Sequence, residues 1–248
     1  MKKIHLIITR QKDPDSKPYQ EEFLVSYRPN MNVISALMEI QKRPVNVKGE
    51  VTSPVHWESS CLEEVCGACS MLINGKPRQA CSTLIDQIKQ PIWLRPLRTF
   101  PVVRDLIIDR QRMFDSLKRV KAWIPIDGTY DLGAGPRLPE KKRQWAYELS
   151  KCMTCGCCLE ACPNVNDRSR FIGPAPISQV RLFNAHPTGE MNKEERLRAI
   201  MMSGGMTECG NSQNCVQVCP KGIPLTTSIA HMNREVTIFA FKSFFGDY

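Results

Sequence analysis

Alternation of apolar and polar positions marks the start of the chain. Residues 3–10 (KIHLIITR) and 21–28 (EEFLVSYR) alternate in this way on either side of a turn-rich KDPDSKP segment. Period-two alternation around such a turn predicts a β-hairpin. A cysteine-containing loop and further strands follow, so we expect a small α+β ferredoxin-like domain that ends at about residue 105.

A helix is predicted directly after the hairpin. Asn32 can cap the segment VISALMEIQKR, and Pro44 ends it. The apolar face that we expect this helix to bury consists of Val33, Leu37, Met38, Ile40 and Gln41.

Helical spacing replaces strand patterns after about residue 106. Loops rich in proline and glycine, such as DLGAGPRLPEKK and FIGPAP, separate the helical segments. A mostly helical second domain is therefore expected, with domains at 1–105 and 106–248, and a length of 248 residues agrees with two modest domains. The predicted helices are 110–123, 141–151, 176–184, 193–202 and 225–242.

The twelve cysteines change this picture most. No apolar stretch is long enough to span a bilayer and no secretory signal is recognisable at the N-terminus, so we expect a peripheral protein inside the cell. Thiols stay reduced in that compartment, which favours metal or redox chemistry over disulfides.

The formal charge of +9 could suggest a nucleic-acid partner. That count treats the cysteines as neutral, whereas cysteines that hold metal are negative. If the cysteines hold three iron–sulfur clusters at roughly −2 each, the charge falls to about +3, so we expect no nucleic acid.

The first cysteine group has the spacing C-x4-C-x2-C-x11-C. It consists of Cys61, Cys66, Cys69 and Cys81, the spacing of plant-type [2Fe–2S] sites. An Asn74-Gly75 turn should fold the last ligand back beside Cys69. A four-cysteine zinc site is the alternative, although zinc sites usually pair two C-x2-C knuckles.

Two later runs resemble each other. CMTCGCCLEACP contains Cys152, Cys155, Cys158 and Cys162 in the spacing of two-cluster bacterial ferredoxins. CGNSQNCVQVCP repeats this spacing with Cys209, Cys215 and Cys219, and Ser212 occupies the place of the second cysteine.

The last cysteine of each such run ligates the other cluster. This rule gives Cys152, Cys155, Cys158 and Cys219 to a [4Fe–4S] cluster. It leaves Cys162, Cys209 and Cys215 for a [3Fe–4S] cluster, because a serine hydroxyl is a poor ligand at neutral pH. If Ser212 does ligate, the third cluster would be a cubane instead. Cys157 falls outside the spacing, and we expect it to pack as a small apolar residue rather than to bind iron.

In order and spacing, these motifs resemble the iron–sulfur subunits of succinate dehydrogenase and fumarate reductase. The matching segments are CLEEVCGACSMLINGKPRQAC, CMTCGCCLEACP, FIGPAP and CGNSQNCVQVCPKGIPLT, and the resemblance is closest to enzymes of Gram-positive, menaquinone-using bacteria. It implies a β-grasp N-terminal domain, a helical C-terminal domain and electron transfer from a separate FAD-containing flavoprotein subunit to quinone. It also implies a membrane anchor, with or without haem b, and a position on the cytoplasmic face of the cell membrane.

One departure from the family concerns quinone. Members with a quinone pocket beside the trinuclear cluster have a tryptophan shortly after the Cys-Pro pair and a histidine after the first cysteine of the last run. Here CPNVNDRSRF lacks the tryptophan, and Gly210 follows Cys209. We therefore do not assign the family's quinone site to this chain, although Pro163 matches the family pattern. The alternative is that quinone is reduced elsewhere, through haem in the membrane anchor.

No residue is assigned a catalytic role. Dinucleotide and P-loop motifs are absent, so flavin is expected on another chain. Three alternatives to this function remain. The chain could be a fumarate reductase subunit, a freestanding ferredoxin, or a protein whose clusters only stabilise its fold. The C-terminal aromatics could pack the last helix or face a membrane anchor: Phe239, Phe241, Phe244 and Phe245.

Overall fold

The computed structural model describes residues 2–124 and 137–246 in two compact units. Unit 1 comprises Met1–Arg110 and Met153–Ala161, and unit 2 comprises Gln111–Cys152 and Cys162–Tyr248. The first part of the loop predicted at DLGAGPRLPEKK, residues 131–136, lies outside the described residues. The division into domains 1–105 and 106–248 stays a prediction.

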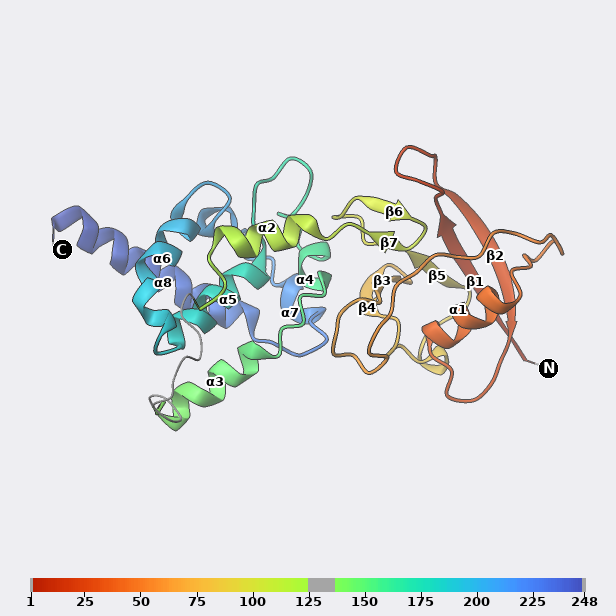
Figure 1. The fold of residues 1–248 in the computed structure, drawn as a ribbon, viewed down its shortest axis with the longest axis horizontal. Coiled ribbons are helices and arrows are strands. Elements are labelled where there is room, and N and C mark those ends of the chain that lie inside the picture. Colours follow the sequence, from red (N-terminus) through yellow and green to blue (C-terminus); the bar gives the residue numbers. More distant parts are fainter. Residues whose placement is uncertain (1, 125–136, 247–248) are drawn as a thin grey trace. The chain divides into compact units, whose positions relative to one another are not determined.

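Unit 1 is built on a mixed five-stranded sheet with the order β2-β1-β5-β3-β4. The predicted hairpin is present, because β1 and β2 pair antiparallel, whereas β1 and β5 run parallel. Helix α1 lies beside the sheet (Figure 1). Apolar side chains of α1 and of the sheet share one buried core. A separate two-stranded ribbon follows the sheet. The elements are β1 (Lys3–Arg10), β2 (Tyr19–Ser26), α1 (Val33–Lys42), β3 (Ser70–Ile73), β4 (Lys76–Gln79), η1 (Ile85–Gln87), β5 (Ile92–Arg95), β6 (Val102–Arg104) and β7 (Ile107–Ile108).

Helix α1 begins at its predicted cap. The Asn32 side chain accepts the backbone N–H of Ser35 at 2.8 Å, which satisfies one of the first N–H groups of the helix. The prediction of a buried face is wrong for two of its residues, because Met38 is 44% exposed and Gln41 is also exposed. At 100° per residue, Met38 lies beyond the edge of the buried stripe, and the polar Gln41 in the last turn keeps its contact with water.

A buried ion pair fixes the segment that leads to the first cysteine group. Arg10 is 2% exposed and its Nε donates to Asp105 Oδ1 at 3.0 Å. Asp105 also accepts the backbone N–H of His56 at 2.9 Å, and Arg10 donates to Ser53 O at 3.0 Å. Because both charges are compensated, this network holds the extended chain before Cys61 against the sheet.

Unit 2 is helical, as predicted. Helix α5 lies at its centre, in contact with α2, α3, α6 and α8 (Figure 1). No helix among the described residues is both long and apolar enough to cross a bilayer. The helices of unit 2 are α2 (Gln111–Arg119), α3 (Glu140–Ser150), α5 (Pro174–Ala185), η2 (Gly189–Asn192), α6 (Lys193–Met201), η3 (Met206–Glu208), α7 (Asn214–Gln217) and α8 (Leu225–Phe245), whereas α4 (Cys157–Glu160) belongs to unit 1.

Candidate metal centres

The β3–β4 hairpin brings the last cysteine of the first group next to Cys69. Its turn has the expected residues at positive φ, Asn74 at 49° and Gly75 at 77°. Ile73 pairs with Lys76, and the N–H of Ala80 donates to the carbonyl of Cys69 at 3.1 Å. The Cys69 and Cys81 thiols consequently interact, and burial together with this contact raises the pKa of Cys69 to about 12.

The loop before β3 wraps its backbone around the first sulfur. Cys61 Sγ accepts N–H groups from Glu63 at 3.5 Å, Val65 at 3.2 Å and Cys66 at 3.3 Å. These bonds lower the pKa of the Cys61 thiol to about 7. N–H groups aimed at sulfur stabilise thiolate, the form that ligates iron, so this donor set fits an iron–sulfur cluster. Positive φ at Leu62 and Glu64 curls the loop into this shape.

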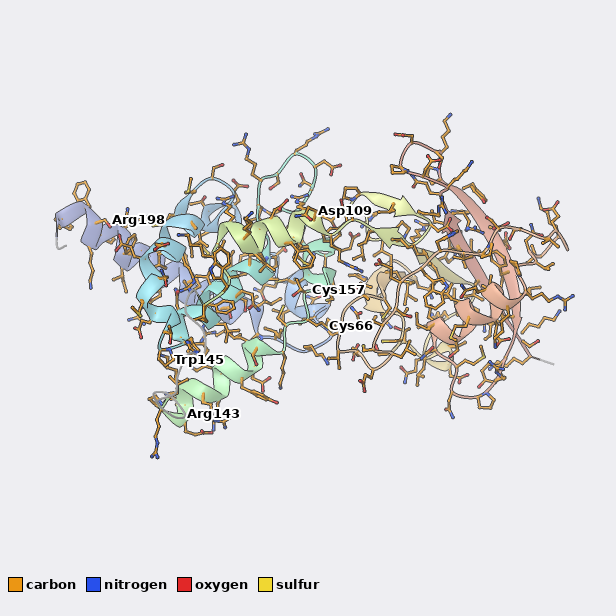
Figure 2. The ribbon with its side chains drawn as sticks, viewed as in Figure 1. Cys66, Asp109, Arg143, Trp145, Cys157 and Arg198 are labelled. Carbon is orange, nitrogen blue, oxygen red and sulfur yellow. The ribbon has the colours of Figure 1, made fainter. Side chains whose placement is uncertain are left out.

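The same loop meets the second cysteine run at Gly67. A Cβ at Gly67 would lie 2.8 Å from the Cβ and 2.9 Å from the Cα of Cys155, and 2.9 Å from the carbonyl oxygen of Met153. Only glycine fits such an approach, and the φ of +74° also favours it. The backbones that carry the first and second cysteine groups are therefore in direct contact within unit 1, where Figure 2 labels Cys66 and Cys157.

Within unit 1, Glu160 anchors the second cysteine run near its C-terminal end. This side chain is almost fully buried and accepts Arg98 Nε at 3.1 Å and the backbone N–H of Thr99 at 2.9 Å. Gly156, at φ +85°, opens α4 against the ring of Phe100. The short helix is held from both sides, which fixes the cysteines on it.

Three cysteines of this run lie together in unit 1. Cys157 is fully buried and Cys158 is 9% exposed. A hydrogen bond from the Cys157 thiol lowers the pKa of Cys155 to about 7. The same bond, together with burial, raises the pKa of Cys157. The expectation that Cys157 packs in the interior agrees with its burial, but its thiol also has polar partners.

Unit 2 brings together the three cysteines predicted for the trinuclear site. Burial and the neighbouring Cys209 raise the pKa of Cys162. Burial raises the pKa of Cys215 as well, with further contributions from Cys162 and Cys209. The Cys162 and Cys215 thiols thus lie near Cys209, as ligands of one cluster should.

The loop around Cys209 is fixed by Asn164. Its Nδ2 donates to the carbonyl of Glu208 at 2.7 Å, and its Oδ1 would lie 3.0 Å from a Cβ at Gly210. Glu208 in turn accepts the N–H of Gly204. The space beside Gly210 is therefore taken by an amide side chain.

Cys152 and Cys219 both belong to unit 2. Cys152 follows α3 and donates its N–H to the carbonyl of Leu149 at 3.3 Å. Cys219 follows α7, and its Sγ accepts the N–H of Ile223 at 3.4 Å. Their predicted co-ligands Cys155 and Cys158 belong to unit 1, so this four-cysteine set stays a prediction from spacing.

Other candidate groups have structural partners. His5 Nε2 lies 2.7 Å from Glu22 Oε2, and His56 Nδ1 lies 3.0 Å from Asp105 Oδ2. Within residues 2–124 and 137–246, no three histidine, cysteine or acidic side chains are arranged to hold a single metal ion. Ser212 is exposed in the loop before α7.

Sequence reasoning missed two residues beside the cysteines, Gln79 and Asn164. Gln79 lies at a buried position of the alternating strand β4, and a buried glutamine needs polar partners. That alternation was visible in the sequence, whereas the identity of the partners was not.

Comparison with known proteins supports the class defined by these cysteines. Residues 5–115 match the family described as a 2Fe-2S iron-sulfur cluster binding domain, and residues 148–223 match a 4Fe-4S dicluster domain. A solved structure titled Mycobacterium smegmatis Sdh1 complex in the apo form shares the fold, with a TM-score of 0.77, 24% identity and coverage of 94% of this chain and 95% of that chain. The chain is thus an iron–sulfur protein with one 2Fe-2S cluster binding domain and one 4Fe-4S dicluster domain.

Relatives define the family more narrowly. The succinate dehydrogenase iron-sulfur subunit of Bacillus subtilis (strain 168) is 74% identical over 245 residues, which cover 99% of this chain and 97% of the relative. The fumarate reductase iron-sulfur subunit of Wolinella succinogenes is 31% identical over 225 residues, which cover 89% of this chain and 91% of the relative. The chain belongs to the family of succinate dehydrogenase and fumarate reductase iron–sulfur subunits.

Proposed function

We propose that the chain is the electron-transfer subunit of a succinate:quinone oxidoreductase and works in the direction of succinate oxidation. The observation that carries this proposal is the 74% identity to a succinate dehydrogenase subunit over 99% of the chain. Fumarate reductase catalyses the reverse of the same reaction, and the fumarate reductase iron-sulfur subunit of Wolinella succinogenes is only 31% identical.

The proposal assigns three clusters to three sets of cysteines. When bound, the clusters accept and release single electrons. The chain's own part is to supply thiolates, to donate N–H groups to sulfur and to keep the ligand groups close together. The sets are Cys61, Cys66, Cys69 and Cys81 for [2Fe–2S], Cys152, Cys155, Cys158 and Cys219 for [4Fe–4S], and Cys162, Cys209 and Cys215 for [3Fe–4S].

Contacts in each unit support parts of this assignment. Cys61 with its three N–H donors, and Cys69 beside Cys81, agree with the first set. The mutual influence of the thiols in unit 2 agrees with the third set. The direct approach of Gly67 to Cys155 supports electron passage from the first ligand group to the second.

The partners we propose are an FAD-containing flavoprotein subunit, which holds the dicarboxylate site, and a membrane anchor with haem b, which delivers electrons to menaquinone. This places the chain peripherally on the cytoplasmic face of the cell membrane. Three C-terminal aromatics are available to a partner, since Phe241, Phe244 and Phe245 are 60%, 82% and 71% exposed. Phe239 is instead buried and packs its helix.

Purification of the native complex tests the function. We expect the chain to copurify with a flavoprotein and a membrane protein, to contain about nine irons per chain, and to pass electrons from succinate to a menaquinone analogue. Low-temperature EPR should show a three-iron signal in the oxidised complex and a [2Fe–2S] signal after reduction. Zinc in place of iron, or a chain that purifies alone and is fully reducible, would contradict the proposal.

A further inference from the structure

An arginine of unit 1 is bound to the loop that carries the first cysteine group. Arg110 Nη2 donates to the carbonyl oxygen of Ala68 at 2.7 Å. Ala68 lies between Cys66 and Cys69 in the sequence, and its own N–H donates to Cys66 Sγ at 3.4 Å. The guanidinium of Arg110 is therefore hydrogen-bonded to the residue that directly precedes Cys69, a predicted ligand of the first centre.

The backbone around Arg110 is fixed by the two-stranded ribbon of β6 and β7. Arg110 follows β7 closely, and the N–H of Asp109 donates to the carbonyl of Pro101 at 2.8 Å. The N–H of Leu106 donates to the carbonyl of His56 at 3.1 Å, which ties the ribbon to the segment before the first cysteine loop. The arginine side chain therefore starts from a backbone that hydrogen bonds hold on two sides.

The positive charge of Arg110 is only partly compensated. Its Nη1 donates to Glu58 Oε2 at 3.1 Å. Its buried Nε has no hydrogen-bond partner among the residues that the structure describes. The Glu58 side chain is 41% exposed, whereas that of Arg110 is 16% exposed. Because water screens the carboxylate more strongly than the guanidinium, the positive charge dominates the electrostatic potential in the interior.

The sign of the expected effect follows from the charge of each redox state. On the proposed function, Cys66 and Cys69 hold a [2Fe–2S] cluster, which becomes more negative when it is reduced. A fixed positive charge nearby lowers the free energy of the reduced state and so raises the reduction potential. A negative charge at the same place has the opposite effect.

We propose that Arg110 tunes the first centre electrostatically: its bond to Ala68 fixes the guanidinium beside the cysteine loop, and its charge raises the reduction potential of the [2Fe–2S] cluster. This inference rests on the proposed function, since it takes Cys66 and Cys69 as ligands of that cluster. Glu58 counteracts the effect from its more exposed position, so the two members of one ion pair influence the same centre in opposite directions. A pair that only braced the loop would not give opposite signs.

Redox titration of the purified complex, followed by the EPR signal of the reduced [2Fe–2S] cluster, separates charge from structure. In Arg110→Met we expect the ratio of reduced to oxidised cluster at a fixed potential to fall about threefold, or about 28 mV for a one-electron couple. Glu58→Gln should raise the same ratio about twofold, a smaller change because water screens this charge better. Arg110→Lys keeps the charge and should stay near the wild-type potential.

The matched control is Arg28→Met, because Arg28 also pairs with a carboxylate of unit 1, Glu39 at 2.8 Å, but its side chain is 61% exposed. This variant should leave the potential unchanged. An unchanged potential in Arg110→Met, or an equal fall in Arg110→Lys or Arg28→Met, overturns the inference. Shifts of the same sign in Arg110→Met and Glu58→Gln would also contradict it.

Loss of the cluster in Arg110→Met would leave the decision to Glu58→Gln: a raised potential supports the role of the charge, and an unchanged or lowered one refutes it. A wild-type complex without a reducible two-iron signal would instead refute the proposed function.

Discussion

Gly67 and Cys155 approach so closely that a single methyl group at Gly67 would lie 2.8 Å from the Cys155 Cβ. Electron transfer depends steeply on separation, so on the proposed ligand assignment we expect this contact to control passage from the first ligand group to the second.

Gly67→Ala should therefore impair transfer more than it impairs folding. The added methyl must push the two backbones apart, and the positive φ adds about 1 to 2 kcal/mol of strain. We expect the rate at which succinate reduces the second cluster in the purified complex to fall about tenfold, measured by freeze-quench EPR.

Gly75→Ala is the control for strain alone. Gly75 has a φ of +77°, but nothing lies within 4 Å of its hypothetical Cβ. This variant should carry a similar backbone strain without the clash, and its transfer rate should stay near that of the wild type. Equal rates in the Gly67 and Gly75 variants would show that the close approach has no role in transfer.

Ser212→Cys should convert the trinuclear site to [4Fe–4S]. The substitution completes the spacing of the second ferredoxin-like run and adds the missing thiolate. We expect the oxidised three-iron EPR signal to disappear and the iron content to rise by about one per chain. Ser203→Cys, at an exposed position of the same unit, should leave the signal intact. Retention of the three-iron signal in Ser212→Cys would mean that the two runs are aligned wrongly.

Asp105→Asn should destabilise unit 1. Burial alone would raise the pKa of Asp105, but the bond from Arg10 and the N–H groups of His56 and Gln11 outweigh it and hold the pKa below its ordinary value. Asparagine removes one of the two carboxylates that pair with Arg10 while Glu21 remains, so the loss should be about 2 kcal/mol at pH 7. Urea titration of the complex, followed by the visible circular dichroism of the [2Fe–2S] centre, measures the loss.

The contribution of Asp105 to folding stability should depend on pH in a defined direction. Because the folded pKa of Asp105 is depressed, its contribution is complete above about pH 4 and is lost as the pH falls through the folded pKa. The wild type and the Asn variant should thus converge in stability in strong acid. Asp15→Asn, at an exposed turn position, should match the wild type throughout. Equal stability of the wild type and Asp105→Asn at pH 7 would argue against the ion pair.

Local signals in the sequence predicted much of this structure. The Asn32 cap, the Asn74-Gly75 turn and the helices of unit 2 depend on nearby residues, and all are present. The short helices α4 and α7 were not predicted, because each has only four residues and follows a residue at positive φ, Gly156 or Gln213. No periodic pattern can develop over so short a segment.

Long-range partners could not be predicted in the same way. Gln79 and Cys157 are 78 residues apart, and nothing in either local pattern links them. The same is true of Gly67 and Cys155, whose contact depends on how the second run returns to the first loop. Cysteine spacing predicts a ligand set, and that assignment stays a prediction, whereas the contact between Gln79 and Cys157 became visible only in three dimensions.

The exchange of the last cysteine between the two ferredoxin-like runs is the central claim, and an iron-resolved density map of the purified complex tests it most directly. The account predicts that Cys219 is bonded to the four-iron cluster held by Cys152, Cys155 and Cys158, and that Cys162 is bonded to the three-iron cluster with Cys209 and Cys215. Density that joins Cys219 to the cluster of Cys209 and Cys215, or Cys162 to the cluster of Cys152, would contradict it.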